Sequence, residues 1–215
     1  MTTPLRRTAA RALRALGVAA LASSAALTVL AAPASASASA SAPTVTGFDP
    51  ETNTHDWEGR KDWVCVNGYY RIRTPFSTPQ GSDNVLDMSL ATPMPGIIIQ
   101  HEWNTGSNQQ WGLCYIGSGS TASFALVNRR NGRLCMGIGD AGRLDASWLA
   151  AFDCGSPPPD HQQFSIIRDP ADRNRVLLQL KHSGNFVAVS APGERDAVVA
   201  QYSYRATQFT LEWLG

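Results

Sequence analysis

The 215 residues include 43% hydrophobic residues, four cysteines, and 18 basic against 17 acidic side chains. Arg6, Arg7, Arg11 and Arg14 account for four of the basic residues, so residues 41–215 carry 14 basic and 17 acidic side chains, a net charge of −3. A mildly acidic chain without a basic stripe binds nucleic acid poorly, because neutralisation of phosphates supplies most of that affinity. Nucleic acid is therefore excluded as a partner.

Residues 1–40 have the pattern of a secretory signal peptide. The basic head is followed by an apolar run from Ala15 to Ala32, and then by an Ala/Ser tract with small-residue cleavage options such as Ala36-Ser37-Ala38. The alternative is a single membrane anchor, since the run is almost long enough to span a bilayer. The small-residue tract favours the signal peptide, so we expect a secreted, extracellular protein whose mature form does not insert into a membrane.

Residues 41–64 differ in composition from the rest of the chain. Small, polar and acidic residues dominate, with Phe48, Trp57 and Trp63 as the aromatic side chains. We expect an N-terminal extension whose end docks on the following domain; the alternative is a disordered linker.

From residue 65 to residue 215 the chain repeats one unit of about 45 residues three times. Each unit ends in a polar phrase closed by an aromatic residue: Asn108-Gln109-Gln110-Trp111, His161-Gln162-Gln163-Phe164 and Ala206-Thr207-Gln208-Phe209. Apolar segments recur in phase before these phrases, at 70–72, 86–88 and 97–99, at 124–126, 135–137 and 148–150, and at 178–180, 186–188 and 198–200. Each unit therefore predicts four short strands, and the three units predict twelve.

The four cysteines are expected to form disulfides, because they belong to an exported chain. Four cysteines permit three pairings, and the repeat selects among them. The positions of Cys135 and Cys154 hold bulky apolar residues in the other units, where they are expected to fill the same space: Leu86 with Trp103, and Phe186 with Tyr204. The predicted pairs are Cys135 with Cys154 and Cys65 with Cys114. Zinc is disfavoured, since there is no C-x-x-C and no histidine at ligand spacing; no metal or cofactor is expected.

The three units resemble those of the ricin-type (Q-x-W) β-trefoil lectin family, and a secreted bacterial member in particular. The resemblance covers about residues 65–215 and is strongest in the first unit; the third has Thr207 in place of the first glutamine. It implies an all-β fold with pseudo-threefold symmetry and almost no helix, in which three hairpins cap a six-stranded barrel. Trp111, Phe164 and Phe209 would then lie in the core.

The resemblance also implies a shallow sugar pocket that can occur once in each unit. A carboxylate accepts hydrogen bonds from two sugar hydroxyls, a ring stacks on the apolar face of the sugar, and an Asn-Gln pair fixes the carboxylate. In the first unit these roles fall to Asp87, to His101, and to Asn108 with Gln109, although Ile99 stands where the family often has Gln. The alternatives are a solvated turn acid for Asp87 and a surface histidine without a role for His101.

The other two units lack the carboxylate and are expected to be vestigial sites. Gly137 occupies its position in the second unit and Ala188 in the third, and aspartate at either position is expected to restore a pocket in part. Phe152 and Tyr202 are still expected to be able to stack on a sugar.

We expect a binding protein and not an enzyme. Spacing marks no carboxylate pair for glycoside hydrolysis, and the sequence has no G-x-S-x-G elbow, no H-E-x-x-H and no phosphate-binding glycine loop. The favoured function is a carbohydrate-binding protein whose partner is a glycan or polysaccharide. The alternative is a degenerate trefoil that binds a separately encoded toxin or enzyme subunit. Loss of two pockets favours the alternative, and the intact first unit favours the lectin.

Overall fold

The fold is that of a computed structural model, which describes residues 54–57, 60–77, 81–91, 95–116 and 122–215. All of these residues belong to one compact unit, Ala42–Gly215. The predicted signal peptide and the first part of the N-terminal extension lie outside the described residues. No helix among the described residues is long and apolar enough to cross a membrane.

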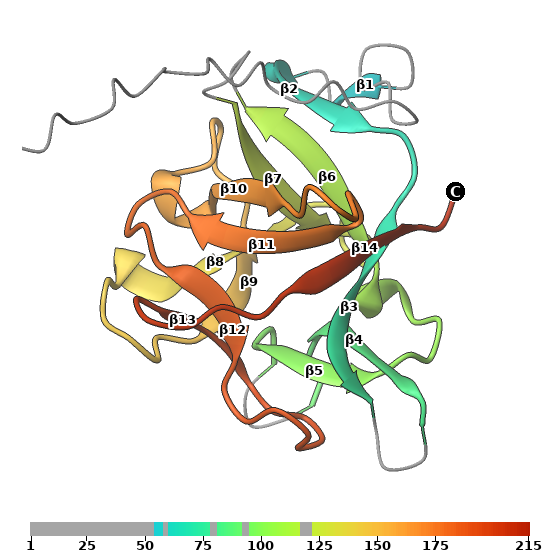
Figure 1. The fold of residues 1–215 in the computed structure, drawn as a ribbon. Helices are drawn as coiled ribbons and strands as arrows, with labels where there is room; N and C mark the ends of the chain where they lie inside the picture. Colours follow the sequence, from blue (N-terminus) through green and yellow to red (C-terminus); the bar gives the residue numbers. More distant parts are fainter. Residues whose placement is uncertain (1–53, 58–59, 78–80, 92–94, 117–121) are drawn as a thin grey trace, which may run out of the picture. The chain divides into compact units, whose positions relative to one another are not determined.

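The described residues form fourteen strands and three short 3-10 helices (Figure 1). A first hairpin, β1 (Thr54–Trp57) and β2 (Arg60–Val66), precedes the repeated units. The first unit contains β3 (Tyr70–Ser77), β4 (Asp83–Met88), β5 (Ile98–Glu102), η1 (Ser107–Gln109) and β6 (Trp111–Ile116). The second contains β7 (Ser123–Asn128), β8 (Leu134–Ile138), η3 (Gly139–Ala141), β9 (Leu149–Asp153), η4 (Asp160–Gln162) and β10 (Phe164–Arg168). The third contains β11 (Arg175–Leu180), β12 (Phe186–Val189), β13 (Val199–Tyr202) and β14 (Phe209–Trp213).

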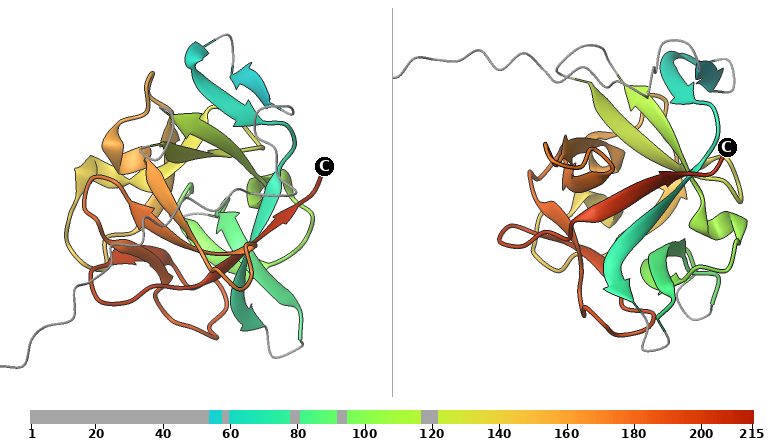
Figure 2. Two further views of the ribbon diagram at one scale, coloured as in Figure 1. Left: turned by 45° about the horizontal axis from the view of Figure 1, so that its top comes forward. Right: turned by 45° about the vertical axis from the view of Figure 1, so that its right-hand side comes forward.

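Six strands close a barrel, because each pairs antiparallel with a neighbour on both sides. β3 pairs with β6, β6 with β7, β7 with β10, β10 with β11, β11 with β14, and β14 returns to β3. The other six strands of the three units form the hairpins β4–β5, β8–β9 and β12–β13 (Figure 2). Closure leaves the barrel without an open edge. The predicted all-β trefoil is therefore confirmed.

The three hairpins contact one another around the pseudo-threefold axis. Single backbone bridges form a closed cycle from the first unit to the second, from the second to the third, and from the third back to the first: Ile97–Ala150, Trp148–Ala200 and Val198–Ile99. The cycle places residues of the third unit beside the hairpin of the first.

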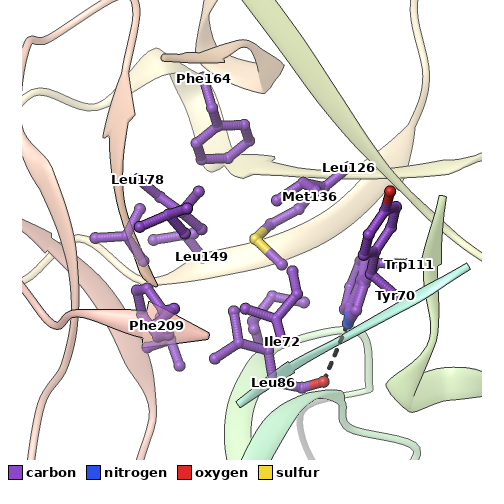
Figure 3. Close-up of a cluster of buried hydrophobic side chains, with 14 of the residues drawn as sticks. Tyr70, Ile72, Leu86, Trp111, Leu126, Met136, Leu149, Phe164, Leu178 and Phe209 are labelled. Atoms are coloured by element: carbon purple, nitrogen blue, oxygen red, sulfur yellow. Dashed lines mark hydrogen bonds between the residues drawn. The ribbon is translucent and has the colours of Figure 1, made fainter. Parts of the chain in front are cut away.

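The aromatic residues that close the three units share one core, as predicted. Trp111, Phe164 and Phe209 are each 0% exposed and belong to the same buried cluster (Figure 3). The ring nitrogen of Trp111 donates a hydrogen bond to the carbonyl of Leu86 at 3.0 Å, so the one polar atom of this ring is satisfied within the core. The closing phrase is thus a structural feature in all three units.

The strand register corrects one detail of the repeat alignment. Trp111 lies opposite Tyr70, Phe164 opposite Phe124, and Phe209 opposite Val176. The recurrent segment of the third unit therefore begins at Val176, two residues before the predicted 178–180. Side chains in a strand alternate with a period of two, so this shift leaves the same face toward the core and could not be seen from the apolar pattern.

Two disulfides join Cys65 to Cys114 and Cys135 to Cys154, the pairs that comparison of the units predicts. The aligned positions are partly wrong. In the second unit, Cys135 lies opposite Phe152. The residue of the first unit at the matching position is Val85, which lies opposite His101, and not Leu86. A slip of one residue exchanges the two faces of a strand. In the third unit Tyr204 is 73% exposed, so no buried apolar pair replaces the disulfide there.

Charged side chains join the first barrel strand to the last. Glu212 on β14 accepts hydrogen bonds from Arg71 and Arg73 on β3, and Arg73 also donates to Asp83 at 2.6 Å. Burial raises the pKa of the Glu212 carboxyl, but the hydrogen bonds and charges of Arg73 and Arg71 outweigh burial and lower this pKa overall. Ionised Glu212 therefore stabilises the fold.

Glu212→Gln is expected to lower the free energy of unfolding by about 1 kcal/mol at pH 7, because two charge-assisted hydrogen bonds are weakened. A carboxyl whose pKa is lowered in the fold contributes stability above its unfolded pKa, and this contribution is lost as the pH falls through the folded pKa. The difference between variant and wild type should therefore shrink below about pH 4. Urea denaturation at pH 7 and pH 3 measures it, and an equal difference at both pH values would contradict this role of Glu212.

Candidate functional site

Asp87 lies near the end of β4 and is 4% exposed. Each of its carboxylate oxygens accepts a hydrogen bond: Asn108 Nδ2 donates to Oδ1 at 2.9 Å, and Gln109 Nε2 donates to Oδ2 at 2.8 Å. Asp87 is therefore not a solvated turn acid. An ionised carboxylate has about four acceptor positions, so these two bonds leave acceptor capacity on both oxygens.

The turn η1 holds both amide side chains in one orientation. Gln109 Nε2 also donates to the carbonyl of Glu102 at 2.8 Å, and its Oε1 accepts the backbone N–H of Asn104 at 2.8 Å. Asn108 Nδ2 also donates to the carbonyl of Met88 at 3.2 Å. These bonds fix which end of each amide faces Asp87. The carboxylate is thereby oriented before any ligand arrives.

A pocket with a volume of about 410 Å³ opens beside this carboxylate. Three of the four predicted site residues, Asp87, His101 and Asn108, line it. The fourth, Gln109, is 0% exposed and supports Asp87 through its hydrogen bond. The aliphatic side chains of its lining are Leu90, Ala91, Ile97, Ile99 and Val198. The pocket thus combines an oriented carboxylate with an apolar surface.

His101 lies on β5 and faces residues of the third unit. Its Nδ1 is 2.9 Å from the carbonyl of Glu102, and its Nε2 is 3.6 Å from Oδ1 of Asp196 and 3.5 Å from a guanidinium nitrogen of Arg195. The side chain of His101 is 24% exposed. The ring is therefore placed by contacts from two units and borders the pocket between them.

Two lining residues, Asp196 and Val198, come from the third unit and were missed by sequence reasoning. The backbone bridge between Ile99 and Val198 brings their segment to the first-unit hairpin. No motif within one unit signals this contribution, because it arises from the packing of one unit against the next.

Burial raises the pKa of Asp87, and the hydrogen bonds from Gln109 and Asn108 and the charge of His101 offset only part of this rise. Asp196 raises the pKa further through its negative charge. A carboxylate that is kept in a pocket despite an unfavourable environment is typical of a functional site.

The second unit has no room for a carboxylate at the position of Asp87. A Cβ on Gly137 would lie 2.8 Å from the carbonyl oxygen of His161 and 2.8 Å from Cγ of Gln162. The turn η4 therefore closes this position with its own backbone. The expectation that an aspartate at Gly137 partly restores a pocket is wrong for this reason.

Gly137→Asp is accordingly expected to lower the free energy of unfolding by about 1–3 kcal/mol through steric overlap. It should add no sugar-binding site. Thermal denaturation and a sugar titration of the variant measure the two effects, and a second site in a variant of unchanged stability would contradict the closed geometry.

In the third unit, Arg205 covers the ring that was expected to stack on a sugar. Its guanidinium carbon lies 3.7 Å from the centroid of Tyr202, and it donates a hydrogen bond to the carbonyl of Ser190 at 3.1 Å. Tyr202 is only 6% exposed and packs with Ala188 and Ala200. Tyr202 is therefore not available for stacking, and that prediction is wrong.

No protein-family model and no curated protein matches the chain. Among solved structures, the chain is similar to the designed 3-fold symmetric protein ThreeFoil, with 27% identity and a TM-score of 0.55 over 69% of this chain and all of that one. It is similar to a Polyporus squamosus lectin bound to an influenza-binding epitope, with 16% identity and a TM-score of 0.54 over 68% of this chain and 49% of the lectin. It is also similar to a Macrolepiota procera ricin B-like lectin in complex with lactose, with 19% identity and a TM-score of 0.51 over 69% and 99% of the two chains. These similarities confirm the β-trefoil architecture, which the chain shares with ricin B-like lectins.

Proposed function

We propose that the protein binds carbohydrate through the first-unit pocket, with Asp87 as the acceptor for two sugar hydroxyls. The observation that supports this most is the buried carboxylate of Asp87, which Asn108 and Gln109 orient at the side of an open pocket. A preoriented carboxylate forms charge-assisted hydrogen bonds with hydroxyl donors, and the geometry of its two oxygens suits neighbouring hydroxyls.

Each lining group has a distinct role in this proposal. Asn108 faces both Asp87 and the pocket and is placed to contact a sugar hydroxyl as well. Ile99 and Val198 offer an aliphatic surface to the C–H face of a sugar ring, and His101 provides the one ring among the described lining residues. Aliphatic side chains and an imidazole form a smaller platform than Tyr or Trp. The dissociation constant should therefore be on the order of 1 mM, about −4 kcal/mol.

The two disulfides support a secreted, extracellular location, since such bonds persist in oxidising compartments. Binding of a glycan or polysaccharide outside the cell, without catalysis, is the role that we propose. The second and third units lack the carboxylate, which favours one alternative, a subunit that binds a separately encoded toxin or enzyme.

A titration with neutral sugars tests the proposal. We expect galactose, lactose or xylose to shift NMR signals of Asp87, His101 and Asn108 in a saturable way. Shifts centred on Phe152 or Tyr202 would place binding in another unit. The absence of shifts with every sugar would contradict carbohydrate binding and leave the toxin-complex alternative.

A further inference from the structure

The described residues that line the pocket include more acidic than basic side chains. Its carboxylates are Asp87 and Asp196, and among its described lining residues His101 is the only basic side chain. Arg195 lies outside the lining; its Nε is 3.7 Å from Oδ2 of Asp196, and its side chain is 68% exposed. Water screens such an exposed pair strongly. A ligand in the pocket therefore lies close to two carboxylates.

The first unit itself holds the loop that carries Asp196. Gln100 on β5 is 0% exposed, and its Nε2 donates a hydrogen bond to the carbonyl of Glu194 at 2.6 Å. The backbone N–H of Gln100 donates to the carbonyl of Ala197 at 2.9 Å. These two hydrogen bonds flank Asp196 in the chain, so they fix its position at the pocket.

The backbone of this loop does not require an acidic residue. The bridge cycle makes Val198 and Trp148 equivalent, so Asp196 in the third unit corresponds to Ala146 in the second. Both residues have left-handed backbone conformations, with φ of 58° for Asp196 and 63° for Ala146. The same turn thus forms with an uncharged side chain. At this position the second-unit copy has alanine, whereas the copy that borders Asp87 has a carboxylate.

We propose that Asp196 is a specificity-determining residue of the first-unit pocket, which selects a sugar with a free amine over the same sugar with a carboxylate. This inference rests on the proposed carbohydrate binding. An ammonium group gains attraction from Asp196 while the hydroxyls bind Asp87, whereas a carboxylate on the ligand is repelled by both acids. A half-exposed charge contributes modestly to binding, so we expect affinity to change severalfold and not by orders of magnitude.

One sugar in three charge states tests the proposal: galactose, galactosamine and galacturonate, with the glucose series in parallel. In the wild-type protein at low salt and pH 6, we expect the amino sugar to bind about three- to fivefold more tightly than the neutral sugar. The uronate should bind more weakly than the neutral sugar. Asp196→Asn, which retains a residue tolerant of the left-handed conformation, should reduce both ratios to within about twofold.

A matched control removes the same charge elsewhere. Asp160 in the second unit pairs with Lys181 at 3.1 Å and does not line the pocket. Asp160→Asn should leave all three affinities unchanged, which separates a local contact from an effect of net charge. Raising the salt concentration should weaken the preference of the wild type, because screening acts on exposed charges.

The outcomes distinguish this inference from the proposal on which it rests. Unchanged ratios in Asp196→Asn, or tighter binding of the uronate by the wild type, would overturn the role of Asp196 and leave binding at Asp87 intact. Failure of all sugars to bind the wild type would overturn both.

Discussion

Replacement of Asp87 by alanine is expected to weaken sugar binding more than tenfold, to below detection at a wild-type dissociation constant of about 1 mM. The variant loses the acceptor for two sugar hydroxyls, and a hydrogen bond to a charged group contributes about 1.5–3 kcal/mol. Asn108 and Gln109 keep their second contacts, to the carbonyls of Met88 and Glu102, so the walls of the pocket should persist. Calorimetric or NMR titration of both proteins measures the effect.

The same substitution should change stability by much less. A carboxyl whose pKa is raised in the fold contributes stability below its unfolded pKa, and this contribution is lost as the pH rises through the folded pKa. At pH 7 the buried charge of ionised Asp87 thus destabilises the fold. Alanine removes this destabilising charge together with two hydrogen bonds. The free energy of unfolding should change by no more than about 1–2 kcal/mol.

Asp87→Asn is the matched variant, because it keeps the shape of the side chain and removes the charge. Gln109 cannot turn its amide without losing the contact of its Oε1 with the N–H of Asn104. In this variant the oxygen of the new side-chain amide should therefore face Gln109, and its nitrogen should face Asn108. Both variants should fold and bind poorly. Wild-type affinity in either folded variant would show that Asp87 does not bind the sugar.

Features that recur within each unit could be predicted from the sequence. The closing aromatics Trp111, Phe164 and Phe209 recur in phase because each one fills the same place in a symmetric core. Their spacing predicted three repeated units, and the resemblance of these units to ricin-type β-trefoil lectins implied the trefoil. Asp87, Asn108 and Gln109 belong to one unit and occupy fixed positions in its motif. The structure brings these three together as expected.

Contacts between units, and close contacts within one, could not be predicted. Asp196 reaches the pocket through the packing of the third hairpin against the first, which leaves no mark on the pattern of either unit. The closure of the position at Gly137 depends on the close approach of η4, which would bring two of its atoms to 2.8 Å from a Cβ there. The position of Arg205 over Tyr202 depends on the rotamer of a long side chain. Apolar periodicity carries no information on any of these.

The register of β4 could not be predicted from the sequence either. The apolar pattern placed an apolar segment correctly along the chain, but it did not distinguish Val85 from Leu86, since both are buried. The faces of β4 are told apart only by their partners on β5, where Val85 lies opposite His101 and Leu86 opposite Gln100. A strand with both faces covered has no polar side to fix its alignment.

Trp111→Ala is expected to have the largest effect on stability, a loss of about 3–5 kcal/mol, because it removes a fully buried ring from the core. It also leaves the carbonyl of Leu86 without its hydrogen bond. Trp111 directly follows the turn that holds Asn108 and Gln109, so a variant that remains folded should also bind sugar more weakly. Trp111→Phe should cost less, because phenylalanine fills the equivalent position in the other two units.

Trp213→Ala provides the matched control for this prediction. Trp213 lies at the end of β14, is 59% exposed, and donates one hydrogen bond to the carbonyl of Asn67 at 3.3 Å. Its removal should lower the free energy of unfolding by less than about 1 kcal/mol, since little buried surface is lost. Urea denaturation of the three variants and the wild type measures the order, with Trp111→Ala the least stable. Similar losses for Trp111→Ala and Trp213→Ala would mean that the closing aromatic does not anchor the core, and the structural role of the repeated phrase would have to be abandoned.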